Sequence, residues 1–231
     1  MIIHNAHLEH FPRPIGTDIE LKKGECVLLL GNSGCGKTSL LKAIAGFSDL
    51  HAGEIDRNNK RVAMLLQNPF NQIIMQKVWD ELYFPLKNAG KSEEEIDLEI
   101  EKIAEILKIE HLLDRNISTL SFGETQLSMI AATCLTKADI FLMDEPTSHL
   151  DPPGINTFYK YMSKLANSGK SILITSQSPD EYRFVDKVWI MEDGKIKAKI
   201  LADTCPETLN EQNIILDSIL IKMRLKELKQ K

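Results

Sequence analysis

Short continuous apolar runs recur along the chain and alternate with stretches of helical periodicity. The runs lie at residues 25–30, 62–66, 140–143, 171–175 and 188–191. After the first run, the sequence TSLLKAIAGF places apolar residues at helical spacing. Runs of this kind are typical of strands that helices cover on both faces. The pattern therefore predicts an α/β fold with a mostly parallel sheet.

The region from about residue 78 to residue 136 has a different character. Ser92 is followed by three glutamates, which is typical of a helix start because serine caps the first turn and acids favour it. The apolar residues that follow fall on one helical stripe: Ile96, Ile100, Ile103, Ile106 and Leu107. We interpret this region as a helical lobe inserted between the strands.

These patterns predict a single domain over residues 1–231. Its core covers about 1–77 and 137–202, its helical lobe about 78–136, and an amphipathic helix with a basic end about 208–231. That last helix either packs on the core, with its lysines at the favourable C-terminal end, or lies on a membrane surface.

Composition narrows the classes of function. A net charge of −5 gives no support for a nucleic-acid-binding surface. Four cysteines are too few and too irregularly spaced for a disulfide framework, so we expect a reducing compartment. No stretch approaches the roughly 18 apolar residues of a membrane helix, and the N-terminus lacks a signal-peptide pattern. His4, His7 and His10 fit an edge strand better than a metal site, because His7 would face away from the other two.

The first apolar run leads into a phosphate-binding loop. Residues 31–38, GNSGCGKT, match GxxxxGK[ST] between a strand and a helix, as the motif requires. Glycines let consecutive N–H groups converge on phosphate oxygens at a helix N-terminus. Lys37 adds charge to the β and γ phosphates, and the Thr38 hydroxyl ligates Mg²⁺. The predicted ATP-binding set is Asn32, Ser33, Gly34, Cys35, Gly36, Lys37, Thr38 and Ser39.

Two further features bear on this loop. Cys35 lies near a helix N-terminus, which predicts a lowered thiol pKa and a block of ATP binding on alkylation. The strand at 140–143 ends in two acids, Asp144 and Glu145. An aspartate there can hold Mg²⁺, and the following glutamate can orient or deprotonate the attacking water.

Four segments in this order resemble the ATPase subunits of ATP-binding-cassette (ABC) transporters: GNSGCGKTS, Gln67, LSFGETQ and IFLMDEPTSHLD. The resemblance runs from about residue 2 to about residue 200. It implies a RecA-like P-loop core, an antiparallel β part near the N-terminus and an inserted α-helical lobe. It also implies a head-to-tail dimer, in which each ATP lies between one subunit's P-loop and the other's signature motif.

The same resemblance implies roles for particular residues. Gln67 senses the γ-phosphate and Mg²⁺ and links the two lobes, so that Thr38, Gln67 and Asp144 form the metal set. Glu145, Gln67 and Lys37 form the catalytic set. Ser121 and Gly123 contact the ATP of the opposite subunit, and Asp151 lies at the dimer seam. Phe11 either stacks on adenine or packs in the core.

A narrower resemblance begins at Gln67. The segments QNPFNQI and VWDELYFPLKN are similar to the energy-coupling-factor branch, whose ATPases drive uptake of vitamins and of cobalt or nickel. In that branch this segment meets coupling helices of a shared transmembrane subunit. Trp79, Tyr83 and Phe84 are either exposed for such a contact or packed within the lobe.

Three departures from the family pattern matter. In the signature, Phe122 replaces a glycine and Glu124 replaces a glutamine, which adds negative charge unless it is paired. The arginine usual a few residues later is absent, with Leu127 in its neighbourhood. The switch histidine is replaced by Ser176 or, with a shift of one residue, by Gln177. Neither side chain passes on a proton as imidazole does.

We therefore predict a peripheral subunit at the cytoplasmic face of the cell membrane that binds ATP and Mg²⁺ and powers an importer through ATP-driven dimerisation. Its predicted partners are a second ABC ATPase subunit and integral membrane transport subunits. The altered signature favours a heterodimer over a homodimer. Two alternatives remain: a soluble ABC ATPase without a membrane partner, and a nucleotide-sensing subunit that hydrolyses weakly.

Overall fold

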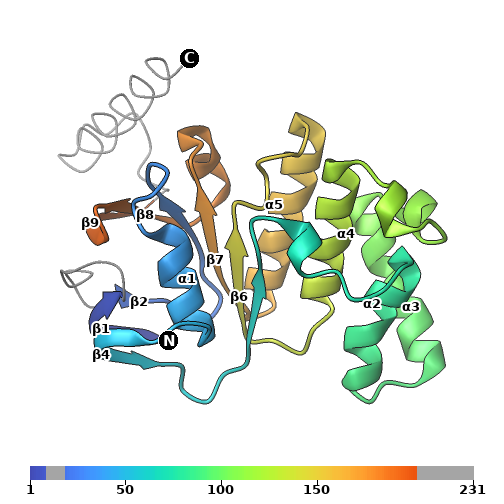
Figure 1. Cartoon of the computed structure of the whole chain (residues 1–231), viewed down its shortest axis with the longest axis horizontal. Coiled ribbons are helices and arrows are strands. Elements are labelled where there is room, and N and C mark those ends of the chain that lie inside the picture. The colour runs from blue at the N-terminus through green and yellow to red at the C-terminus, as the bar shows by residue number, and fades with distance from the viewer. Residues whose placement is uncertain (9–18, 202–231) are drawn as a thin grey trace.

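The larger of two β-sheets forms the centre of the molecule (Figure 1). The computed structural model describes residues 1–8 and 19–201. The six strands of this sheet lie in the order β5-β6-β7-β3-β8-β9, and every neighbouring pair is parallel except β8 with β9. The strands are β3 (Cys26–Leu30), β5 (Val62–Leu65), β6 (Ile140–Asp144), β7 (Ser171–Ser176), β8 (Lys187–Glu192) and β9 (Lys195–Leu201). The five predicted apolar runs are five of these six strands, and the α/β prediction is confirmed.

A second sheet lies beside the N-terminal part of the core. It is antiparallel, with the order β2-β1-β4, and its strands are β1 (Ile2–Leu8), β2 (Ile19–Glu20) and β4 (Leu50–Asp56). This sheet confirms the antiparallel β part near the N-terminus. The sequence pattern did not predict β4, because its four central residues, HAGE, are exposed and form no apolar run.

Two hydrophobic layers cover the two faces of the large sheet. On one face α1 (Lys37–Ala45) and the antiparallel sheet pack against alternate residues of the strands, such as Val27 and Leu29. On the other face α5 (Pro152–Asn167) packs against β3 and β7, and α4 (Phe122–Cys134) packs against β5. The helices α2 (Val78–Asn88) and α3 (Glu93–Leu107) extend this hydrophobic layer by packing against α4 and α5. The short 3₁₀ turns are η1 (Pro69–Asn71), η2 (Glu110–Leu112), η3 (Ile117–Thr119) and η4 (Pro179–Phe184).

The helices α2, α3 and α4 lie together at one end of the molecule (Figure 1). Helix α3 begins as predicted, because the Ser92 hydroxyl accepts from the Glu95 N–H and the Glu95 carboxylate accepts from the Ser92 N–H. Its apolar stripe is buried except at Ile106, which is half-buried. Reciprocal capping of this kind fixes where the helix starts.

Several sequence predictions fall on residues outside this description. Phe11, His10 and the predicted C-terminal helix lie there. Among the described residues, no helix has the length and apolar character needed to span a bilayer. Within the same ranges, no cluster of three or more His, Cys, Asp or Glu side chains is placed to hold a metal ion.

Candidate active site at the phosphate-binding loop

The phosphate-binding loop joins the C-terminal end of β3 to the first turn of α1. Gly34 and Gly36 have φ of +77° and +107°, a left-handed backbone that glycine adopts without a steric cost. A Cβ on Gly31 would lie 2.5 Å from both the Cys35 sulfur and the Met191 carbonyl oxygen, so only glycine fits there. The loop therefore needs its glycines for backbone shape and for close packing against β8.

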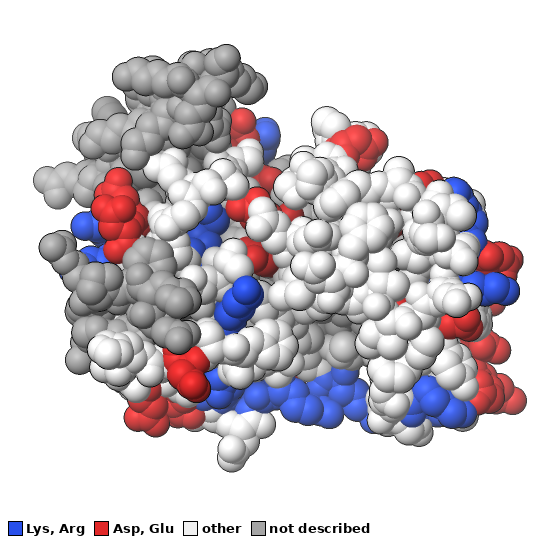
Figure 2. All heavy atoms as spheres, viewed as in Figure 1, with Lys and Arg blue, Asp and Glu red and all other residues white. Residues whose placement is uncertain are grey.

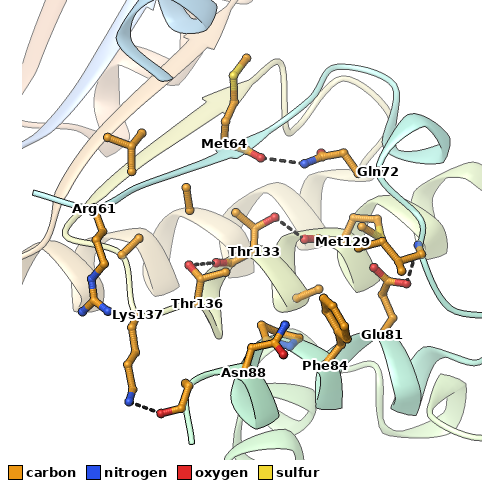
Figure 3. A pocket seen from close by; sticks show the side chains of 17 residues that line it. Arg61, Met64, Gln72, Glu81, Phe84, Asn88, Met129, Thr133, Thr136 and Lys137 are labelled. Carbon is orange, nitrogen blue, oxygen red and sulfur yellow. Dashed lines mark hydrogen bonds between the residues drawn. The ribbon is translucent and has the colours of Figure 1, made fainter. Parts of the chain in front are cut away.

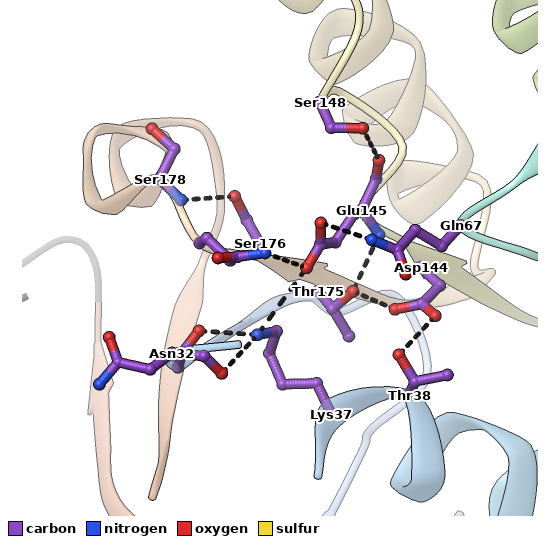
Figure 4. A network of polar contacts seen from close by, with 12 residues as sticks. Asn32, Lys37, Thr38, Gln67, Asp144, Glu145, Ser148, Thr175, Ser176 and Ser178 are labelled. Carbon is purple, nitrogen blue, oxygen red and sulfur yellow. Dashed lines mark hydrogen bonds and ion pairs between the residues drawn. The ribbon is translucent and has the colours of Figure 1, made fainter. Parts of the chain in front are cut away.

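Lys37 is held at the centre of this loop. Its side chain is 5% exposed, and its ammonium donates to the carbonyls of Gly31 at 2.7 Å and Asn32 at 3.1 Å (Figure 4). The same ammonium lies 3.9 Å from the Glu145 carboxylate. A buried ammonium with these partners is positioned as a fixed positive charge at the helix N-terminus.

Cys35 corrects one expectation. Its side chain is buried below the loop, and the Cys35 carbonyl accepts from the Gly194 N–H at 2.8 Å. Burial raises the pKa of this thiol, and this effect outweighs the lowering by Lys37. The predicted lowering of the thiol pKa is therefore wrong, because the thiol faces the protein interior.

Asp144 ends the fully buried strand β6 next to the P-loop. It accepts two hydrogen bonds of 2.7 Å, one from the Thr38 hydroxyl to Oδ2 and one from the Thr175 hydroxyl to Oδ1. Its side chain is 1% exposed, and burial raises its pKa despite these two donors. A bound cation would favour the ionised form again. A hydroxyl and a carboxylate side by side are oxygen ligands of the kind that Mg²⁺ prefers.

Glu145 turns away from the sheet directly after Asp144. Its φ of +49° is left-handed, which is uncommon for a residue with a side chain. The Glu145 N–H donates to the Thr175 hydroxyl at 2.9 Å, and this contact fixes the turn. The carboxylate accepts from the Gln67 amide at 3.1 Å and from the Gln177 amide at 2.7 Å (Figure 4). The predicted catalytic residues Lys37, Gln67 and Glu145 thus lie together.

The segment after β7 shows which residue faces the site where a switch histidine was expected. The Gln177 amide reaches Glu145, whereas the buried Ser176 hydroxyl accepts from the Ser178 N–H at 2.9 Å. Sequence reasoning did not identify Thr175 as a site residue. Thr175 contacts Asp144 and Glu145 because it lies opposite Asp144 on the neighbouring strand. The register between two strands cannot be recognised from a local sequence motif.

The signature segment caps α4. The Ser121 hydroxyl accepts from the Glu124 N–H at 3.3 Å, and the Glu124 carboxylate accepts from the Ser121 N–H at 2.7 Å. Arg115 lies 3.5 Å from the same carboxylate. The backbone N–H of Ser121 is the main cause that lowers the pKa of Glu124. The added charge of Glu124 is therefore paired, and the Ser-x-x-Glu spacing was the sequence signal for it.

Phe122 packs against residues that follow Gln67 and Glu145. Its ring centroid lies 3.9 Å from that of His149 and 5.5 Å from that of Phe70. A Cβ on Gly123 would lie 2.9 Å from the His149 carbonyl oxygen. Among the described residues, no hydrogen bond or ion pair joins Ser121 or Gly123 to the P-loop. The signature residues therefore pack against the segment before Asp151 and do not contact the phosphate site of their own subunit.

A strand, a glycine-rich loop, a buried lysine and an acidic strand end define a P-loop nucleotide-binding domain. The sequence profile of the ABC transporter family matches residues 16–148. The chain belongs to this family and is one of its ATPase domains.

Individual relatives agree with this assignment. An ABC transporter ATP-binding protein of Listeria monocytogenes is 30% identical over 195 residues, which cover 78% of this chain and 73% of that protein. A Bacillus subtilis protein provisionally named HMP/thiamine import ATP-binding protein YkoD is 32% identical over 238 residues, 91% of this chain and 44% of that protein. Only 34% of a Methanosarcina mazei relative is matched, so the chain spans well under half the length of some relatives.

Solved structures share the fold. The protein cbiO1 from Clostridium perfringens, described as part of the ABC transporter complex cbiONQ, superimposes with a TM-score of 0.75 at 23% identity, over 100% of this chain and 98% of its own. The dimeric bacterial cassette MJ0796 superimposes with a TM-score of 0.76 at 20% identity, over 89% of this chain and 100% of its own. At these identities the likeness concerns the fold.

Proposed function

We propose that this chain is the ATP-binding and ATP-hydrolysing subunit of an energy-coupling-factor-type ABC importer. The observation that carries the proposal is the intact network at the P-loop, in which Thr38, Thr175 and Glu145 are arranged around the buried carboxylate of Asp144. ATP and Mg²⁺ are the cofactors that these residues fit.

Each residue of the network has a task in phosphoryl transfer. Lys37 and the loop N–H groups would hold the phosphates, and Thr38 and Asp144 would hold Mg²⁺, which would neutralise phosphate charge. Gln67 lies beside this corner through its contact with Glu145 and completes the proposed metal set. The amides of Gln67 and Gln177 donate to the two carboxylate oxygens of Glu145. Once one amide moves away, the freed oxygen can accept a proton from the attacking water or orient that water.

A groove between β5 and the helices α2 and α4 supports a membrane partner. It has a volume of about 610 Å³ (Figure 3). The amide of Gln72 donates to the Met64 carbonyl at 2.7 Å and fixes one wall, and Phe84 lines the groove. Ile74 is 63% exposed at its edge. An apolar groove of this size fits an amphipathic helix from another subunit.

Of the three aromatic residues considered for this contact, Phe84 is the one that faces the groove. Trp79 and Tyr83 are partly buried against the lobe core, and the Tyr83 hydroxyl donates to Glu93 at 3.0 Å. Lobe packing therefore accounts for Trp79 and Tyr83. Phe84 remains available to a coupling helix.

The signature region supports a pair of unlike subunits. Phe122 packs against His149 with the two ring planes tilted by 52°, and it places a ring where a glycine would let a neighbour's phosphate approach closely. The Glu124 charge no longer adds to this argument, because Arg115 and the Ser121 N–H engage it. We infer a peripheral assembly at the cytoplasmic face with a second ABC ATPase subunit and integral membrane subunits.

Purification of the tagged chain from membranes tests this proposal. Co-purified integral membrane proteins are expected with the parent chain. A charge inserted in the groove by Phe84→Glu should remove them while ATP binding persists. Leu98→Glu is the matched control, because Leu98 is 66% exposed on α3 outside the groove. Equal recovery with all three chains would overturn the groove assignment.

A nucleotide-sensing subunit with weak hydrolysis is the second candidate. The observation that favours it is the Gln177 amide, which cannot transfer a proton and which occupies one oxygen of Glu145. Turnover by the reconstituted complex decides between the two, since a sensor would bind ATP without a rate that depends on Glu145.

A further inference from the structure

A second cavity lies far from the P-loop, where the C-terminal ends of α4 and α5 approach α3. Its volume is about 410 Å³, within the range of roughly 300–1,000 Å³ that is usual for small-molecule sites. Its charged lining consists of Lys91, Glu99, Lys102, Lys137, Lys164 and Lys170. We call it the lysine cavity. Nothing in the ATPase mechanism uses these residues.

The charge of the lysine cavity is opposite to that of the chain. Five lysines face it against one glutamate, whereas the whole chain carries −5. Glu99 is paired with Lys91, and Asp139 lies 3.7 Å from Lys170 just outside the lining. Two of the five ammonium groups are thus offset by carboxylates, and the positive charge that remains around this concave space favours an anion there. In the view of Figure 2, Lys and Arg gather along the lower edge of the molecule.

Structural roles account for only some of these lysines. Lys170 donates to the Ala138 carbonyl at 2.7 Å, and Lys137 donates to the Ala89 carbonyl. Lys102 and Lys164 are exposed, and among the described residues neither side chain forms a hydrogen bond or an ion pair. Those two ammonium groups can therefore serve a ligand without breaking an existing contact.

The rest of the lining indicates the chemistry of that ligand. Tyr161 and the apolar side chains of Ile103, Ile106, Leu135 and Leu165 complete the wall. Lysine binds phosphate as a point charge with three donors, and the lining holds no arginine fork for a planar carboxylate. We propose that the lysine cavity binds a polyphosphate group whose organic body rests on this apolar wall.

The proposed ligand would contact the C-terminal end of α4, and the signature serine lies at the N-terminal end of the same helix. Cys134 and Leu135 line the cavity, and α4 begins directly after Ser121. Lys137 also lines the groove described above. The inference itself is independent of the ATPase proposal, since it concerns binding at residues that the P-loop site does not include.

Isothermal titration calorimetry with sodium tripolyphosphate tests the proposal. The full chain carrying Lys37→Ala is the parent, because this change weakens the P-loop as a competing site. Adding Lys102→Gln and Lys164→Gln should weaken binding about tenfold or more, because the two changes remove two charge-assisted contacts to the phosphates. The control adds Lys42→Gln and Lys160→Gln, two exposed helical lysines outside the cavity, and should stay within about twofold of the parent.

A further variant is expected to change the affinity in the opposite direction. Glu99→Gln should tighten binding a few-fold, because it removes the acid from the lining. Vesicles of phosphatidylcholine with and without cardiolipin distinguish a lipid headgroup from a soluble polyphosphate as the source. If the chain binds only the cardiolipin vesicles, and this binding requires Lys102 and Lys164, the phosphates belong to a lipid headgroup. If neither probe distinguishes Lys102→Gln/Lys164→Gln from Lys42→Gln/Lys160→Gln, the proposal is wrong.

Discussion

Thr175→Val removes a single hydroxyl that two parts of the site share. This hydroxyl donates to Asp144 at 2.7 Å and accepts from the Glu145 N–H at 2.9 Å. Thr175 is fully buried and Asp144 is 1% exposed, so water cannot replace the lost partner without a rearrangement. Valine has nearly the shape of threonine, and the change therefore tests hydrogen bonding more than packing.

The expected loss follows from the groups left without a partner. A buried polar group that loses its partner costs about 1–3 kcal/mol, and two groups are affected. Asp144 keeps its bond from Thr38, so we expect a combined loss of about 2–4 kcal/mol in the free energy of unfolding. Thr175→Ser keeps the hydroxyl and removes one methyl group, which should cost roughly 1 kcal/mol.

Urea unfolding followed by far-ultraviolet circular dichroism, in the presence of EDTA, measures both variants. ATP turnover gives a second readout, because Glu145 loses its anchoring N–H contact in Thr175→Val alone. Equal unfolding free energies for the valine and serine variants would refute the reasoning that this hydroxyl organises the site.

Four further outcomes follow from the geometry. Burial raises the folded-state pKa of Asp144, so its contribution favours folding at low pH and is lost as pH rises through that value; Asp144→Asn should remove this pH dependence in urea titrations with EDTA. Phe122→Gly should raise ATP turnover of the isolated chain if the ring limits a homodimer, and an unchanged rate contradicts that. Gly123→Ala should lower turnover about tenfold by displacing the His149 carbonyl, with ATP affinity unchanged in a filter-binding assay. Alkylation of Cys35 by N-ethylmaleimide should be slow at neutral pH, accelerate with pH, and be slowed by ATP.

Local motifs predicted the parts of the site that adjoin in sequence. The P-loop needs its glycines and lysine within eight residues, and Asp144 and Glu145 follow a recognisable strand. The same is true of α3, whose capping serine and apolar stripe are local signals. These predictions required only the spacing of apolar residues along the sequence and the chemistry of neighbouring residues.

Residues that meet through tertiary structure could not be read in this way. Thr175 reaches Asp144 because β6 and β7 are adjacent in a particular register. Arg115 reaches Glu124 from the turn before α4, and Cys35 is buried in the same hydrophobic cluster as Trp189 and Met191 of β8. Each of these contacts depends on how segments that are distant in sequence pack together. Apolar patterns in the sequence predict the fold class but not these individual contacts.

The proposed role of Glu145 is the central claim, and ATP turnover by the reconstituted complex tests it most directly. The complex with its co-purified partners should lose about 100-fold or more of its rate on Glu145→Gln while still binding ATP, because the amide cannot accept a proton. Turnover equal to that of the parent complex would contradict the account.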